Sequence, residues 1–282
     1  MITSKIKQLP KSTVELEIKI PWIDVKDVYE VMIRRASEEV EVPGFRKGKA
    51  PKKISEKQIN KAKLYENVIR EVIPKGYDQA LREHQIKPIT NPKIELVNAK
   101  ENEDWVVKAT VALMPKIELG KYKEKIREFK KGNTKIWTPK SNEQKKEDEK
   151  PNIDEIIKAL VSEVQIELSD LLIEQEANKL LSDLIDQTQK LGLTIDQYLT
   201  SKGLTSEQLR TDYAKQAQRN LTLELSLSEV AEKENITVTQ QDIDNFISKL
   251  EKEEDKEKLK KNSYFLARLL RQQKTIDYLA NL

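Results

Sequence analysis

One stretch of the chain has no apolar side chain, and it separates two parts of different character. Residues 138–150 contain only Thr, Pro, Lys, Ser, Asn, Glu, Gln and Asp. A segment of this composition cannot bury a core, so we expect a solvated linker. Strand-like and helix-like apolar spacings both occur before it, whereas only helical spacings occur after it. The sequence therefore predicts an α+β domain over 1–115, a charged linker or strap over 116–150 and an all-α domain over 151–282.

The composition argues against an enzyme with a deep core. Charged residues make up 35% of the chain and aromatic residues 5%. Cysteine is absent and His84 is the single histidine, so disulfides, thiolate or histidine metal sites and Ser-His or Cys-His catalysis are poorly supported. We expect no catalytic residue, metal or cofactor. No apolar run approaches the roughly 20 residues that cross a bilayer, and the first residues lack a signal-peptide core. We therefore expect a cytoplasmic protein without a membrane partner.

The N-terminal part alternates between strand and helix patterns. Residues 12–20 have the two-residue period of a strand with one wet face, and residues 22–40 have the three- and four-residue spacings of a helix. Further helices are expected over 55–84, with a break near Pro74 and Gly76. Residues 92–99 and 105–114 predict a hairpin that pairs with the first strand. Residues 122–129 suggest a short extended segment.

The C-terminal part is helical throughout its length. The spacing of apolar residues and the capping residues predict helices at the following positions: 152–164, 169–191, 194–201, 205–234, 239–253 and 255–282. Long helices joined by short polar links are typical of an open bundle or of arms. Their faces are only partly apolar, so we expect exposed grooves.

A basic loop follows the first predicted helix. It consists of Gly44, Phe45, Arg46, Lys47, Gly48, Lys49, Ala50 and Pro51, and Lys52, Lys53 and Lys57 follow it. From 46 to 63 the chain has eight cations and one acid, a net charge of +7, whereas the whole chain carries +3. An aromatic residue beside cations on a loop is typical of a docking tip that binds phosphate and a protein groove. A solvated basic turn remains the alternative.

The loop does not match a nucleotide-binding motif. A Walker loop requires G-x-x-x-x-G-K-[ST], but the spacing from Gly44 to Gly48 is one residue short. Ala50 stands where the motif has Ser or Thr, and the order of helix and strand also differs. The residues therefore disfavour nucleotide binding.

The loop resembles the ribosome-binding signature of the bacterial trigger factor family, G-F-R-x-G-K-x-P, and matches every fixed position. The order of strand, helix, loop, helices and hairpin around it is similar to that family over about residues 10–120. Residues 167–176 resemble the start of the family's helical C-terminal domain. The resemblance implies a ribosome-binding α+β domain followed by an extended all-α domain with long helices and arms. It assigns ribosome contact to Gly44, Phe45, Arg46, Lys47, Gly48, Lys49 and Pro51, with Lys52, Lys53 and Lys57 as a supporting basic patch.

The resemblance also implies partners and an activity. It predicts a chaperone that works without ATP, docks on a large-subunit protein and rRNA near the tunnel exit, and holds unfolded nascent polypeptides. It is compatible with a homodimer of the free protein. Members of the family usually carry a peptidyl-prolyl isomerase domain of the FKBP type, but residues 116–150 are too few for one. We therefore expect no isomerase activity. The alternative is an RNA- or ribosomal-protein-binding module without chaperone activity.

Overall fold

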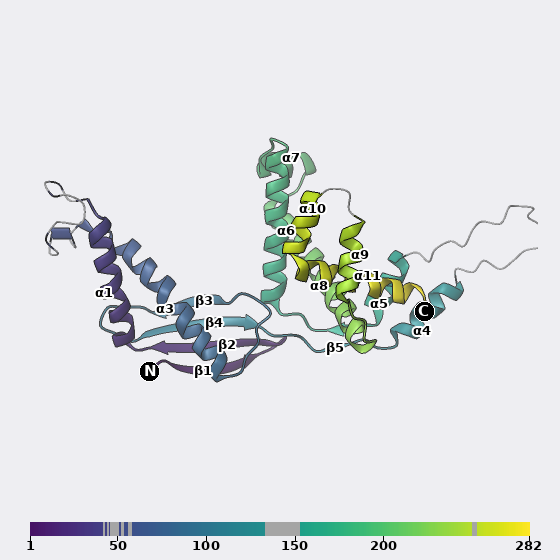
Figure 1. The fold of residues 1–282 in the computed structure, drawn as a ribbon, viewed down its shortest axis with the longest axis horizontal. Coiled ribbons are helices and arrows are strands. Elements are labelled where there is room, and N and C mark those ends of the chain that lie inside the picture. The colour runs from purple at the N-terminus through teal and green to yellow at the C-terminus, as the bar shows by residue number, and fades with distance from the viewer. Residues whose placement is uncertain are drawn as a thin grey trace, which may run out of the picture. The chain divides into compact units, whose positions relative to one another are not determined.

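The computed structural model describes residues 1–41, 43, 45, 51, 54–55, 58–132, 153–249 and 253–282. Its residues fall into two compact units. Unit 1 comprises Met1–Met114 together with Ser169–Leu172, and unit 2 comprises Pro115–Leu168 together with Ile173–Leu282. Unit 1 combines a sheet with helices, and unit 2 consists of helices apart from two very short strands (Figure 1). The predicted α+β part followed by a part with long helices is thus confirmed.

Unit 1 is built on a four-stranded antiparallel sheet. Its strands are β1 (Thr3–Leu9), β2 (Thr13–Ile20), β3 (Lys93–Asn98) and β4 (Trp105–Ala112), and their order in the sheet is β1-β2-β4-β3. The expected pairing of the first predicted strand with the later hairpin is confirmed by the contact between β2 and β4. The sequence prediction missed β1, because its apolar positions are interrupted by lysines.

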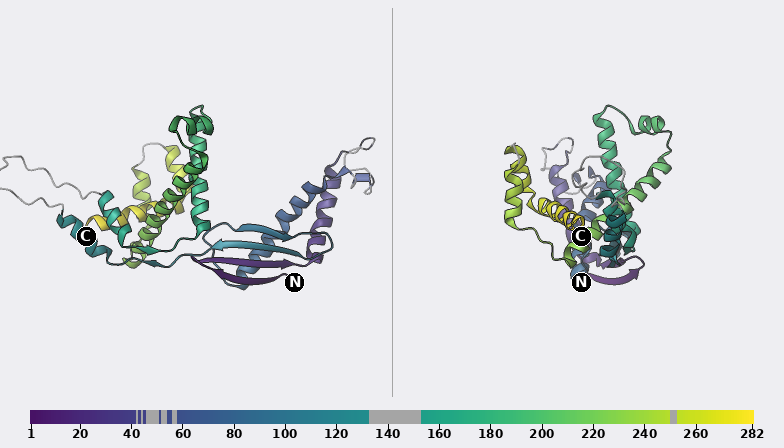
Figure 2. Two further views of the ribbon diagram at one scale, coloured as in Figure 1. Left: turned by 180° about the vertical axis from the view of Figure 1, so that it is seen from behind. Right: turned by 90° about the vertical axis from the view of Figure 1, so that its right-hand side faces the viewer.

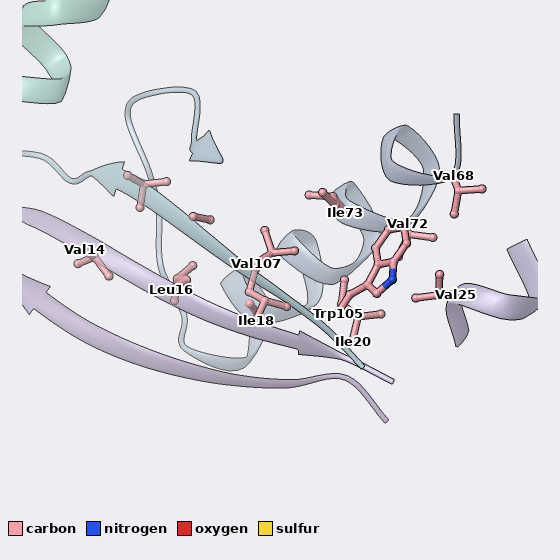
Figure 3. Packing of buried hydrophobic residues seen from close by; sticks show 13 residues of the cluster. Val14, Leu16, Ile18, Ile20, Val25, Val68, Val72, Ile73, Trp105 and Val107 are labelled. Carbon is pink, nitrogen blue, oxygen red and sulfur yellow. The ribbon is translucent and has the colours of Figure 1, made fainter. Parts of the chain in front are cut away.

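One face of the sheet is covered by helices and carries the core of unit 1. The helices are α1 (Trp22–Glu39) and α3 (Lys61–Glu83). Alternate residues of β2 and β4 point toward these helices, and Trp105 lies among Ile20, Val25 and Val72 (Figure 3). The indole of Trp105 is completely buried, stacks on Tyr65 with ring centroids 6.3 Å apart, and donates its Nε1–H to the carbonyl of Lys100 at 3.2 Å. It is therefore the anchor between sheet and helices.

The other face of the sheet carries charges in rows that run across the strands. The register places Lys5 opposite Glu17, Glu17 opposite Lys108, and Lys108 opposite Glu95. Directly opposite residues of antiparallel strands lie on the same face, so this row alternates in sign from one sheet edge to the other. Alternating charge keeps this face soluble without a covering layer.

The break expected at Pro74 and Gly76 is wrong, because α3 continues through both residues. A proline inside a helix costs about 3 kcal/mol. In α3, Pro74 lies on the exposed side, while Val72, Ile73 and Ala80 are buried against the sheet. A Cβ at Gly76 would lie 3.0 Å from Cδ1 of Ile20, so the glycine permits the close approach of α3 to β2. The packing of α3 on the sheet outweighs the cost of the proline.

Unit 2 contains eight helices among the described residues and a small sheet. The helices are α4 (Tyr122–Gly132), α5 (Ile153–Glu163), α6 (Asp170–Lys190), α7 (Ile195–Lys202), α8 (Ser206–Lys233), α9 (Gln240–Ser248), α10 (Glu253–Lys261) and α11 (Ser263–Ala280). The first turn of α6 is grouped with unit 1. Thr194, Thr205 and Thr239 each form a capping box at the start of α7, α8 and α9.

The segment expected to be a linker is packed over its first part. β5 (Ile117–Glu118) pairs with β6 (Gln165–Ile166), and Leu119, Tyr122 and Ile126 are buried in a core with α5, α8 and α11. Residues 122–129 were expected to be extended, but they belong to helix α4. Tyr122, Ile126 and Phe129 have helical spacing, which the high charge of the segment concealed. Residues 133–150 lie outside the described residues.

Two of the predicted C-terminal helices have different bounds. The helix expected over 239–253 ends at Ser248 in α9, and the one expected over 255–282 is divided into α10 and α11. Asn262 separates the last two helices and lies directly before α11. Ile243, Ile247 and Leu266 form a small separate core that joins α9 to α11. Charged residues dominate α10, so the sequence pattern did not locate the division.

A partly buried polar cluster connects α4, α8 and α11. The carboxylate of Glu234 lies 2.7 Å from Nζ of Lys123 and accepts hydrogen bonds from the hydroxyls of Tyr122 at 2.9 Å and Tyr278 at 2.6 Å. The Lys123 and Tyr278 hydrogen bonds lower the pKa of Glu234 to about 2. Burial, followed by the hydrogen bond to Glu234, raises the pKa of Tyr122. The cluster fixes α4 to the end of α8.

We expect Glu234→Gln to lower the free energy of unfolding of unit 2 by about 1–2 kcal/mol, because a partly exposed, charge-assisted cluster loses its anion. The folded pKa of Glu234 is about 2 and its ordinary value is 4.5. The contribution of Glu234 is therefore complete above about pH 4.5 and is lost as the pH falls toward 2. Urea denaturation between these pH values measures it. A variant as acid-sensitive as the original chain would contradict the assignment.

Candidate functional site

The basic loop connects α1 to α3, and those two helices provide its support. The backbone N–H of Val40 donates to the carbonyl of Ala36 at 3.0 Å where α1 ends. The side chain of Asn60 accepts from the N–H of Lys63 at 3.2 Å where α3 begins. Both helices lead away from the sheet toward these ends (Figures 1 and 2). The chain on each side of the loop thus leads into a packed helix, and Asn60 caps the start of α3.

The described residues of the loop region expose two large apolar side chains. Phe45 is 45% exposed and Ile54 is 40% exposed. The carbonyl of Pro51 accepts from the N–H groups of Ile54 at 2.8 Å and Ser55 at 3.1 Å, which forms a helical turn. Ser55 is buried, so this turn has an inner side, and Ile54 lies on the outer side. An apolar residue exposed beside cations can fill a pocket on a partner.

The structure describes only two of the predicted contact residues, namely Phe45 and Pro51, both of which are exposed. The other predicted residues lie outside the described part of the chain, and their roles stay a prediction: Gly44, Arg46, Lys47, Gly48, Lys49, Lys52, Lys53 and Lys57. Ile54 was not among the predicted contact residues. The signal available in the sequence was that this apolar residue directly follows two lysines.

The charge at the described base of the loop is balanced. Arg34, Arg35, Lys61 and Lys63 are exposed there, and so are Glu38, Glu39, Glu41 and Glu66. The hydrogen bond from Lys75 lowers the pKa of Glu71, and the charge of Arg35 on α1 adds a smaller effect in the same direction. The excess positive charge in the sequence therefore belongs to residues 46–57. Any salt-dependent attraction to phosphate should depend on those residues rather than on the helices.

Unit 2 has a second candidate surface between α8 and α11. A cavity of about 80 Å³ is lined by Glu224, Leu227, Ser228, Ala231, Arg268, Arg271, Gln272 and Thr275. Leu227 and Ala231 are buried, and the hydroxyl of Thr275 donates to the carbonyl of Arg271 at 2.7 Å, so this part of the lining is mostly apolar. Arg268 pairs with Glu224 at 3.0 Å across the two helices. Such a cavity can hold one small apolar side chain.

Two groups of exposed apolar residues lie in unit 2. One is on α11, which also lines the cavity, and the other directly follows α6. Phe265 and Leu269 of α11 are about half exposed, and the guanidinium of Arg268 lies 5.7 Å from the ring centroid of Phe265. Leu191 and Leu193 follow α6 on both sides of Gly192 and are exposed. Scattered apolar surface of this kind suits weak contact with unfolded chains.

The described residues contain no group of acidic, histidine or cysteine side chains that could hold a metal ion. His84 ends α3, where its Nε2 lies 3.0 Å from the hydroxyl of Ser4. That hydroxyl donates to Glu83 at 2.5 Å. The carboxylate therefore contacts the serine and not the imidazole, unlike the order of a catalytic triad. Among the helices described, none is long and apolar enough to span a membrane.

Comparison with known families gives matches over both parts of the chain. Residues 2–148 match the model described as bacterial trigger factor protein, and residues 134–281 match the one described as the C-terminus of that protein. The two matches overlap over 134–148, so no stretch between them is left for a third domain. This agrees with the expectation that 116–150 cannot form an isomerase domain.

Curated relatives match part of the chain at the sequence level, and a solved structure shares its fold. The trigger factor of Moorella thermoacetica is 38% identical over 117 residues, which are 42% of this chain and 26% of that protein. The one from Natranaerobius thermophilus is 34% identical over 122 residues, 43% of this chain and 27% of that protein. The chain thus aligns with about a quarter of these relatives. A solved structure titled "Promiscuous Substrate Recognition in Folding and Assembly Activities of the Trigger Factor Chaperone" superimposes with a TM-score of 0.65, 13% identity and 99% coverage of both chains.

Proposed function

The chain belongs to the bacterial trigger factor family, and on that premise we propose that it is a ribosome-associated chaperone that holds newly made polypeptides without ATP. The observation that carries the proposal is the complete G-F-R-x-G-K-x-P match on the loop between two packed helices, with Phe45 exposed. We further propose a cytoplasmic location and, as partners, a large-subunit protein and rRNA near the tunnel exit. A homodimer of the free protein is part of the same proposal.

Docking would combine three physical contributions. Phe45 offers an apolar side chain for a pocket on a ribosomal protein, and Ile54 would extend that contact. Arg46 and Lys47 would pair with phosphate or carboxylate groups, since guanidinium and ammonium both suit such anions. Lys52, Lys53 and Lys57 would add salt-dependent attraction to rRNA. Gly44 and Gly48 would let the backbone expose the tip.

Holding would be done by the partly apolar surfaces of unit 2. Phe265 and Leu269 on α11, Leu191 and Leu193 after α6, and the cavity between α8 and α11 offer several small contacts. Each contact buries one or two apolar side chains, so each is weak and reversible. Several weak contacts let one surface accept many unfolded sequences and release them without an energy source.

We expect the chain to suppress the aggregation of guanidinium-denatured, reduced lysozyme at equimolar concentration, as followed by light scattering. We expect Phe265→Ser combined with Leu269→Ser to reduce this protection by about half, since binding is spread over several surfaces. Ile23→Ser is a control for loss of an exposed apolar side chain elsewhere, because Ile23 is an exposed residue of unit 1 outside these surfaces. Absence of protection by the original chain would favour the RNA- or ribosomal-protein-binding module instead.

We propose that the chain does not act as a peptidyl-prolyl isomerase. The two family matches leave no residues between them for a further domain. Proline-limited refolding of a test protein with catalytic amounts of the chain measures this directly. We expect an unchanged refolding rate, and an accelerated slow phase would contradict the proposal.

A further inference from the structure

Strand β3 forms one edge of the sheet, and no described residue pairs with its outer side. It pairs with β4 on its inner side, and β4 is the one element in the described part of the chain that shares backbone hydrogen bonds with it (Figure 1). No residue of β3 is buried. The unpaired N–H and C=O groups of an edge strand are a template for another extended backbone.

The rows of side chains on the helix-covered face end in exposed apolar residues at this edge. The register aligns Leu16, Ala109 and Ile94 in one row, and Ile18, Val107 and Leu96 in the next. The inner members are completely or almost completely buried, whereas Ile94 is 36% and Leu96 45% exposed. A further strand beside β3 would cover the remaining apolar surface of both rows.

The charged row on the opposite face indicates which charge such a strand should carry opposite Glu95. The row Lys5, Glu17, Lys108, Glu95 alternates in sign and ends with the carboxylate at the β3 edge. A cation opposite Glu95 would continue the alternation, and a like charge there would be unfavourable. With apolar residues opposite Ile94 and Leu96, the complementary strand has the order apolar, cation, apolar.

The opposite edge of the sheet differs from β3. The covered-face positions of β1 include polar Ser4 and Gln8, and Ile6 lies between them. The start of β1 is also held by α3, since Ser4 donates to Glu83 and the Gln79 side chain contacts the carbonyl of Ile2. β1 therefore offers a less apolar edge, part of which is already held by α3.

A second copy of β3 suits this edge less well than a foreign strand. Antiparallel pairing of two copies about Glu95 would place the two Glu95 carboxylates opposite each other. Pairing about Ile94 would bring in Pro92, which has no N–H to donate. A bulge at Val97 interrupts the register on the other side. The short ladder that remains would bury much less than the roughly 1,000 Å² of a specific interface.

We propose that the outer edge of β3 binds an extended apolar-cation-apolar segment of an unfolded polypeptide as a fifth strand of the sheet. This inference rests on the proposed function, because it identifies a class of client sequence. Backbone hydrogen bonds would provide binding to many sequences, and Ile94, Glu95 and Leu96 would provide the selectivity. Unit 1 would then bind a client segment at β3 and would also carry the basic loop that is proposed to dock on the ribosome.

The test uses the full chain and fluorescein-labelled peptides of about seven residues, long enough to span a strand. One peptide alternates valine and lysine, one alternates valine and glutamate, and one is the valine–lysine peptide with alternate backbone amides N-methylated. Binding is measured by fluorescence anisotropy, and the site is located by hydrogen exchange of residues 93–98. The variants are Glu95→Lys and Glu95→Gln. Glu101→Lys makes the same charge change as Glu95→Lys in the exposed turn after β3 and serves as its control.

We expect the valine–lysine peptide to bind about fivefold more tightly than the valine–glutamate peptide, the size of a favourable cross-strand charge pair. Glu95→Lys should reverse this preference, Glu95→Gln should abolish it, and Glu101→Lys should leave it unchanged. N-methylation should remove binding, and residues 93–98 should gain protection. Thermal melting verifies that each variant folds.

Several results would overturn the inference. One is a preference between the two peptides that stays the same in the Glu95 variants. Another is equally tight binding of the N-methylated peptide, and a third is hydrogen-exchange protection outside residues 93–98. A concentration-dependent dimer that disappears in Glu95→Lys would assign the edge to a second copy. If peptide binding at β3 fails while lysozyme aggregation is still suppressed, only this inference is wrong. If suppression also fails, the proposed function is wrong as well.

Discussion

Trp105→Ala is expected to lower the free energy of unfolding of unit 1 by about 3–5 kcal/mol, the range for removal of a buried large aromatic side chain. Trp105 is completely buried, stacks on Tyr65 and packs beside Val25, so the alanine leaves a cavity where the sheet meets both helices. The Lys100 carbonyl also loses its donor. Hydrogen exchange of β2 and β4 amides in increasing urea measures the stability of this unit.

Two substitutions serve as controls for this cavity. Trp105→Phe keeps most of the volume but loses the hydrogen bond to Lys100, so we expect a smaller loss of about 1–2 kcal/mol. Ile23→Ala removes an exposed side chain and should change the stability by less than about 0.5 kcal/mol. If Trp105→Ala costs no more than Ile23→Ala, then Trp105 is not the anchor of unit 1.

Gly120→Ala is expected to destabilise unit 2 by about 2–5 kcal/mol. Gly120 has a φ of +54°, a conformation that costs an L-residue about 1–2 kcal/mol. A Cβ there would also lie 2.7 Å from the carbonyl oxygen of Glu163, a backbone atom that cannot move without displacing the end of α5. Overpacking of this kind costs about 1–3 kcal/mol more. Hydrogen exchange of α4 and α5 amides measures the loss.

Gly203→Ala separates the two contributions. Gly203 has a φ of +65°, similar to that of Gly120, but a Cβ there would meet no atom within 4 Å. This substitution should therefore cost only the conformational penalty of about 1–2 kcal/mol. Equal losses for the two variants would show that contact with Glu163 contributes nothing, and that α4 is not held tightly against α5 at this point.

Local pattern predicted the parts of the fold that depend on nearest neighbours. The alternation in β2, the hairpin of β3 and β4, and the starts of α7, α8 and α9 could be predicted, because each depends on a few adjacent residues. The sequence pattern did not predict that α3 continues through Pro74. This continuation depends on contact between Gly76 and Ile20, which are distant in the sequence.

Charge concealed the elements that the sequence analysis missed. β1 and α4 carry lysines at positions that interrupt their apolar pattern, but Ile6 and Ile126 lie at the correct spacing for a strand and a helix. Neither segment has enough apolar surface to fold alone, so pairing with β2 and packing on α5 supply the missing stability. The basic loop was singled out from its residue types, and its role in docking stays a prediction. The exposure of Ile54 became apparent only with the helical turn after Pro51.

Co-sedimentation with ribosomes tests the central proposal most directly. The variant is Phe45→Ala, Arg46→Ala and Lys47→Ala in one chain, and the control is Lys5→Ala, Ile6→Ala and Lys7→Ala. Both remove two cations and one exposed apolar residue, since Ile6 is 43% exposed. Binding of the original chain should weaken steeply as salt rises. We predict that the loop variant loses at least about 90% of the pelleted protein, more than 1.4 kcal/mol of binding free energy, while the control sediments like the original chain. Undiminished sedimentation of the loop variant, or an equal loss in the control, would contradict the proposal.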